Sequence, residues 1–96
     1  MKVRFTSAAC RELAEAAEFY ETQQSGLGDR FLTEIEEAMT RIRKHPDLWA
    51  HVSPSVRRCL VHRFPFALFY HVTANEIQIL AVADLRRDPS RWEHLL

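Results

Sequence analysis

Ser25-Gly26-Leu27-Gly28 separates two stretches of helical periodicity and contains both glycines of the 96-residue chain. Glycine ends helices readily because it adopts the left-handed backbone conformation at little cost. Helical periodicity extends from Ala8 to about Gln24 before this break, and from about Asp29 to Lys44 after it. A linker of about four residues predicts that the two helices pack as an antiparallel hairpin.

Both expected helices are amphipathic, with apolar side chains spaced to share one face. These side chains are Ala9, Leu13, Ala16, Ala17 and Tyr20 in the first helix, and Phe31, Ile35, Ala38, Met39 and Ile42 in the second. Thr6 or Ser7 is expected to cap the first helix, and Pro46 to end the second. Three acidic residues of the first helix lie mostly on the other face, namely Glu12, Glu15 and Glu18. We expect their side chains to be solvated.

Strand-like sequence flanks the two helices. A short strand is expected from Lys2 to Thr6, where Val3 and Phe5 alternate with charged residues. Further strands are expected within Leu48–Val52, Val56–His62, Phe66–Val72 and Ile77–Ala83. The last of these is the most apolar and is expected to be the central strand. Asp88 as N-cap and Pro89 as first residue favour a short C-terminal helix.

This element order predicts an α+β fold in one domain spanning residues 1–96. An opening strand and a helical hairpin precede a mostly antiparallel sheet of three to four strands. The helices are expected to cover one face of this sheet, which leaves the other face for function. Cys10 and Cys59 are expected to be small core residues, because two cysteines form no disulfide framework or metal motif. The other expected core residues are Val3, Phe5, Leu13, Ala17, Phe31, Ile35, Met39, Val61, Leu68, Ile79 and Val82.

The composition excludes several classes of protein. A chain with 47% hydrophobic and 27% charged residues is neither disordered nor collagen-like. No apolar run approaches the roughly 18 residues of a membrane span, and the N-terminus lacks the apolar stretch of a signal peptide. We therefore expect a cytoplasmic protein. Thirteen basic and thirteen acidic residues balance overall, but residues 1–48 carry a net charge of −2 and residues 49–96 one of +2.

The arginines of the second half are the main candidates for chemistry. Arg57-Arg58 and Arg63 flank one expected strand, whereas Arg86-Arg87 and Arg91 follow the most apolar one. Guanidinium groups at strand ends can converge to bind phosphates, RNA or acidic side chains of a partner. Alternatively, they pair on the surface with nearby acidic residues: Asp84, Asp88 and Glu93. No cofactor motif is present, and His51, His62 and His71 lack a carboxylate placed to complete a metal site.

The whole pattern resembles the RelE/ParE superfamily, toxins of bacterial type II toxin–antitoxin systems, and leans to its ParE-like side. The features that carry the resemblance are Phe5-Thr6, Tyr20, Gly28-Asp29-Arg30-Phe31-Leu32, His45-Pro46, Val56-Arg57-Arg58, Arg63-Phe64-Pro65-Phe66-Ala67-Leu68-Phe69-Tyr70, Ile77–Ala83, Arg86-Arg87-Asp88-Pro89 and Trp92. The resemblance implies a RelE-like fold, growth inhibition, plasmid stabilisation and a cognate antitoxin whose C-terminal segment wraps the toxin. RelE-like members cut mRNA in the ribosomal A site, whereas ParE-like members inhibit DNA gyrase.

The resemblance implies that the ribonucleases depend on a set of basic residues, and this chain matches only part of that set. Arg58 and Arg87 match basic positions, and the candidate acid–base residues are His62, His71 and His94, of which His94 lies near the C-terminus. Leu60 and Ala67 stand where two further basic residues are expected, and no tyrosine lies near the C-terminus. For a binding toxin, the residues expected to contact the target are Arg58, Arg63, Arg86, Arg87, Arg91 and Trp92.

These gaps matter because RNA cleavage needs both cationic groups and a group with a pKa near neutrality. One electrostatic group contributes about 2.7–4 kcal/mol to transition-state stabilisation, so two missing arginines weaken the nuclease hypothesis. We favour a toxin that binds and inhibits its target over an mRNA endoribonuclease. A relic that binds only an antitoxin is a third hypothesis.

Overall fold

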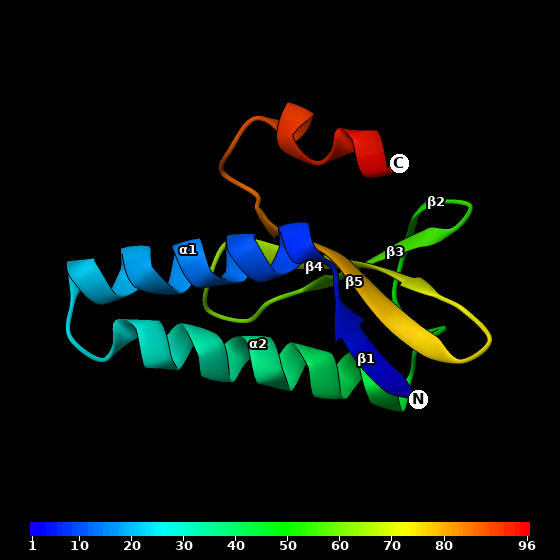
Figure 1. Cartoon of the computed structure of the whole chain (residues 1–96), viewed down its shortest axis with the longest axis horizontal. Helices are drawn as coiled ribbons and strands as arrows, with labels where there is room; N and C mark the ends of the chain where they lie inside the picture. The colour runs from blue at the N-terminus through cyan, green and yellow to red at the C-terminus, as the bar shows by residue number, and fades with distance from the viewer.

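The computed structural model describes all 96 residues and confirms the predicted order of elements (Figure 1). The elements are β1 (Lys2–Phe5), α1 (Ser7–Gln23), α2 (Leu27–Lys44), β2 (His51–Ser53), β3 (Val56–Leu60), β4 (Phe66–Val72), β5 (Glu76–Asp84) and two 3₁₀ turns (Pro89–Arg91 and Glu93–Leu95). The opening strand joins the same sheet as the later four, so the sheet has five strands in the order β1-β5-β4-β3-β2. In Figure 1, α1 lies between α2 and the C-terminal segment, Leu85–Leu96.

The sheet is antiparallel except where β1 runs parallel to β5. The prediction that Ile77–Ala83 forms the central strand is wrong, because β4 occupies the middle and β5 lies between β1 and β4. Five consecutive residues of β4, Phe66–Tyr70, are buried. Such a run is expected for a strand that is covered on both faces.

Local interactions set the helix ends. Thr6 is the N-cap of α1, since its Oγ1 accepts a hydrogen bond from the Ala9 N–H at 3.2 Å. Gly26 has a φ of +88°, and the Glu21 carboxylate accepts the N–H groups of Gly26 and Gly28. With these groups satisfied, α2 starts at Leu27, two residues earlier than predicted. A Cβ at Gly28 would lie 2.7 Å from the Ala17 carbonyl oxygen, so glycine there lets the helices approach closely.

β5 contains a bulge that divides its side chains between the two faces of the sheet. Tyr70 lies opposite Ile79, and Phe69 lies opposite Ala81, which leaves Leu80 as the extra residue. Before the bulge, Ile79 packs toward the helices, whereas after it Ala81 packs toward the other face. Thr6 Oγ1 donates a hydrogen bond to the Leu80 carbonyl at 3.3 Å, so the α1 cap also holds the bulge.

The core has two unequal parts. Fourteen buried residues form the larger cluster between the helices and the sheet. Of the predicted core residues, Phe31, Ile35, Cys59, Val61, Leu68, Ile79 and Val82 are buried in it, whereas Val3, Phe5, Leu13, Ala17 and Met39 pack against it while partly exposed. Cys10 is exposed, so its prediction was wrong; it follows buried Ala9 on the helix and therefore points away from the sheet. We call the opposite side of the sheet the open face.

Candidate functional site

Arg58 lies on the open face of the sheet. It is opposite Phe69 in the pairing of β3 with β4, and opposite residues on antiparallel strands project to the same face. The Trp92 indole packs edge-on against the Phe69 ring at a centroid distance of 4.8 Å. Arg58 and Trp92 therefore flank one phenylalanine, although one comes from β3 and the other from the C-terminal segment. The Arg58 guanidinium forms no ion pair within the chain.

Arg63 lies apart from the other predicted arginines, in the turn between β3 and β4. It has a φ of +69°, a left-handed conformation that is uncommon for a residue with a side chain. Its Nε lies 3.6 Å from Glu34 Oε2 on α2, and its side chain is 82% exposed. The ion pair places this arginine beside α2 instead of on the open face.

Asp84 at the end of β5 forms ion pairs with two of the predicted arginines. Its carboxylate accepts hydrogen bonds from the Arg86 Nε and Nη2 at 3.1 and 3.0 Å, and lies 3.6 Å from the Arg87 Nε. Burial acts to raise the pKa of Asp84, but the hydrogen bonds and positive charge of Arg86, with the charge of Arg87, hold it below its usual value. Arg86 also reaches the Tyr20 hydroxyl at 3.5 Å, which ties the end of β5 to α1.

The acidic neighbours of these arginines behave differently from one another. Asp84 pairs with arginine, as the surface-pairing alternative expected. Asp88 instead caps the first 3₁₀ turn, because its Oδ1 accepts the Ser90 N–H at 2.9 Å and Pro89 stands first in the turn, as predicted. The C-terminal segment forms 3₁₀ turns instead of one continuous helix. Arg91 forms no ion pair.

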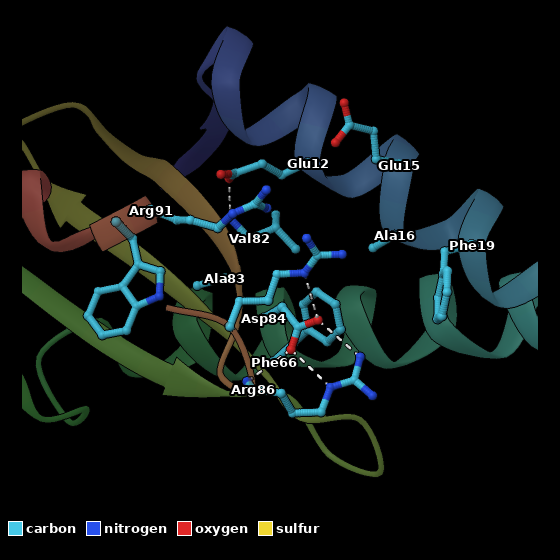
Figure 2. Close-up of a pocket in the computed structure, with 12 residues that line it drawn as sticks. Glu12, Glu15, Ala16, Phe19, Phe66, Val82, Ala83, Asp84, Arg86 and Arg91 are labelled. Atoms are coloured by element: carbon cyan, nitrogen blue, oxygen red, sulfur yellow. Dashed lines mark hydrogen bonds and ion pairs between the residues drawn. The ribbon is translucent and has the colours of Figure 1, made fainter. Parts of the chain in front are cut away.

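A pocket of about 390 Å³ lies between α1, the end of β5 and the C-terminal segment (Figure 2). We call it the α1/C-terminal pocket. Four of the six predicted target-binding residues line it, namely Arg86, Arg87, Arg91 and Trp92, whereas Arg58 and Arg63 do not. Apolar residues of α1 and the sheet form much of the remaining wall, among them Ala16, Phe19 and Phe66.

The acidic side of this pocket was not predicted from the sequence. Glu12 was expected to be solvated, but it is partly buried and its Oε1 accepts the Val82 N–H at 2.9 Å. β1 pairs with β5 only up to Phe5 and Ile79, so the later backbone groups of β5 need another partner. The difference in length between the two expected strands was the signal available in the sequence. Glu15 and Glu18 are exposed, as predicted.

The histidines lie outside the α1/C-terminal pocket. His62 and His94 are exposed, and the Nδ1 of His71 lies 2.8 Å from the Ser55 carbonyl oxygen. Of the candidate nuclease residues, Arg87 lines the pocket, whereas Arg58 and His94 do not. The fold gathers no group of three or more His, Cys, Asp or Glu side chains able to hold a metal ion.

The family of the chain follows from its sequence. Residues 3–89 match the model of the ParE toxin of type II toxin–antitoxin systems, parDE. The chain belongs to the ParE toxin family. The match spans the helical hairpin, nearly the whole sheet, and Arg86 and Arg87 after β5, and it ends before Arg91 and Trp92.

A solved structure has the same fold as this ParE-family chain. It is described as the chromosomal ParDE toxin–antitoxin system from P. aeruginosa, and it superposes with a TM-score of 0.75 at 23% sequence identity. The superposition covers 88% of this chain and 96% of that one. The predicted RelE-like α+β fold is thereby confirmed. No curated protein matches the chain, and no helix is long and apolar enough to cross a membrane.

Proposed function

We propose that this chain is a cytoplasmic toxin that binds and inhibits a cellular target such as DNA gyrase, and that a cognate antitoxin neutralises it. Membership of the ParE toxin family is the observation that carries the proposal. The P. aeruginosa structure of similar fold is itself described as a ParDE toxin–antitoxin system, which supports an antitoxin partner.

The arrangement of charged groups favours binding over RNA cleavage. Arg58 and Arg91 have no acidic partner within the chain and are therefore free to contact one on a target surface. General acid–base catalysis needs a titratable group within hydrogen-bond reach of the reacting atoms. No histidine lines the pocket that holds Arg87. A phosphate bound to Arg87 would therefore have no imidazole beside it to act as general acid or base.

Induced expression tests the proposal directly. Expression alone should stop growth and change DNA supercoiling, and purified protein should inhibit gyrase without cutting mRNA on ribosomes. Co-expression with the product of an adjacent small open reading frame should restore growth and give a co-purifying complex. Codon-specific mRNA cleavage would instead support the endoribonuclease hypothesis. Normal growth together with a stable complex would support the relic.

A further inference from the structure

The α1/C-terminal pocket has an apolar floor between walls of opposite charge. Phe19 at its rim is 48% exposed, which is unusual for so large an apolar side chain, and Ala16 beside it leaves room above the sheet. Glu12 and Glu15 stand on the α1 side, and Figure 2 shows Arg91 extending toward Glu12 from the C-terminal side. The pocket therefore offers apolar contact together with positive and negative charge.

Internal contacts already satisfy most of these charges. Asp84 is held by Arg86 and Arg87. Glu12 accepts the Val82 N–H. Glu15 and Arg91 remain as the charged side chains of the pocket with neither an ion pair nor a side-chain hydrogen bond, and they stand on opposite walls. A partner that complements the pocket must therefore bring a basic group to the α1 wall and an acidic group to the C-terminal wall.

We propose that the pocket receives a segment of the antitoxin carrying an apolar side chain between an acidic and a basic one. The apolar side chain packs on Ala16 and Phe19, the acidic one pairs with Arg91, and the basic one pairs with Glu15. Such a cluster has the composition of a binding hot spot, with an aromatic anchor and an arginine around a small pocket. This inference rests on the proposed function, because that function supplies the antitoxin.

Occupation of the pocket would also explain neutralisation. A segment seated there covers Arg87, Arg91 and Trp92, which are residues predicted to contact the target. Antitoxin and target would then compete for the C-terminal segment. The pairing of charges on opposite walls would restrict binding to antitoxins with the matching order of acidic and basic residues.

A matched pair of substitutions on α1 tests whether the pocket is used. Ala16→Phe fills the pocket floor, whereas Ala14→Phe places the same ring on the exposed side of the same helix. The purified product of the adjacent small open reading frame is the probe, and calorimetry measures its affinity. Ala16→Phe should weaken binding about thirtyfold or more, as loss of a hot spot does, and Ala14→Phe should leave it unchanged.

Charge reversals test the order of the groups in the partner. Arg91→Glu and Glu15→Arg should each weaken binding about tenfold at low salt, and less at high salt. Arg43→Glu and Glu18→Arg are the controls, because both residues are exposed and lie outside the pocket. If Ala16→Phe fails to fold by circular dichroism, these exposed reversals still decide the question.

The outcomes separate this inference from the proposed function. If the wild-type chain binds no antitoxin, the proposed function itself is wrong. If it does bind, and the pocket variants bind as tightly as their controls, the pocket assignment is wrong although the function stands. Loss of gyrase inhibition with unchanged antitoxin affinity would assign the pocket to the target and overturn the inference.

Discussion

The two faces of the sheet differ in how many apolar side chains they bury. The face toward α1 and α2 is covered by a 14-residue cluster that includes Tyr20, Phe31 and Phe66, and the partly buried ring of Phe64 packs against these rings. The open face has a buried cluster of five, and its cover from the C-terminal segment is Trp92 and Leu95. The first face buries far more apolar surface, and burial of such surface is the main source of folding free energy.

The difference separates the face that stabilises the fold from the face to which we assign function. Three of the five residues buried on the open face are alanines, Ala67, Ala81 and Ala83, which contribute little area. The side chains around them include Arg58 and Trp92, both predicted to contact the target. A change on the open face should therefore alter activity at a small cost in stability, whereas a change on the helix face should do the reverse.

The largest effect is expected from truncating the helix-face core. Phe31 is fully buried and contacts three aromatic rings, so Phe31→Ala should lower the free energy of unfolding by about 3–5 kcal/mol. Trp92 is only partly buried, and Trp92→Ala should cost about 1–2 kcal/mol. Urea unfolding of both variants measures the contrast. Equal losses would contradict the comparison, and a loss below about 1 kcal/mol for Phe31→Ala would contradict its role in the core.

The helix face was predictable because its signals are local. Phe31, Ile35 and Ile42 repeat with the helical period, and Gly26 marks the break between helices because it takes a positive φ. The bulge at Leu80 escaped prediction since Ile77–Ala83 is apolar at every position except Gln78, so no alternation shows which side chains face which way. The apolar composition of this stretch indicates that the strand is buried. It does not indicate which side chains face the helices and which face the other side of the sheet.

The candidate site was predictable only where its residues are close in sequence. Arg86, Arg87, Arg91 and Trp92 line one pocket because a single short segment carries them. Its α1 wall depends on where the helix crosses the edge of β5, which is set by tertiary packing. Arg63, predicted to join them, is instead held over α2 by its ion pair with Glu34.

The next largest effect concerns toxicity. Removal of residues 92–96, or Arg87→Ala alone, should reduce growth inhibition about tenfold, because each removes a group predicted to contact the target. Arg43→Ala, an exposed arginine at the end of α2, is the control and should remain toxic. Growth and plasmid supercoiling after induction measure the effect, and circular dichroism shows whether the fold is kept. A fully toxic truncated chain would show that residues 92–96 are not needed for the function.

A smaller effect on folding stability is expected at acidic pH from Asp84, which lies at the end of β5. Because Arg86 and Arg87 lower the pKa of Asp84 in the folded chain, its carboxylate stabilises the fold above its ordinary pKa of 3.8. That contribution is lost as the pH falls through the lower, folded-state pKa. Both arginine side chains are more than half exposed, so the loss should be below about 1 kcal/mol. Asp84→Asn should therefore flatten the stability profile below about pH 4, and an unchanged profile would show that the pairs contribute nothing.

The smallest effect is expected from the histidines, and it decides between binding and cleavage. His62→Ala, His71→Ala and His94→Ala, made singly, should each retain most of the toxicity, because none of these side chains lines the pocket that holds Arg87. A general base, in contrast, typically contributes 10²–10⁴-fold to a rate, roughly, so its loss would be unmistakable. Ribosomes programmed with mRNA should show no A-site cleavage when the wild-type chain is added. Codon-specific cleavage that one of these substitutions abolishes would make the chain a nuclease, and the open face would then hold a catalytic centre where we expect a binding surface.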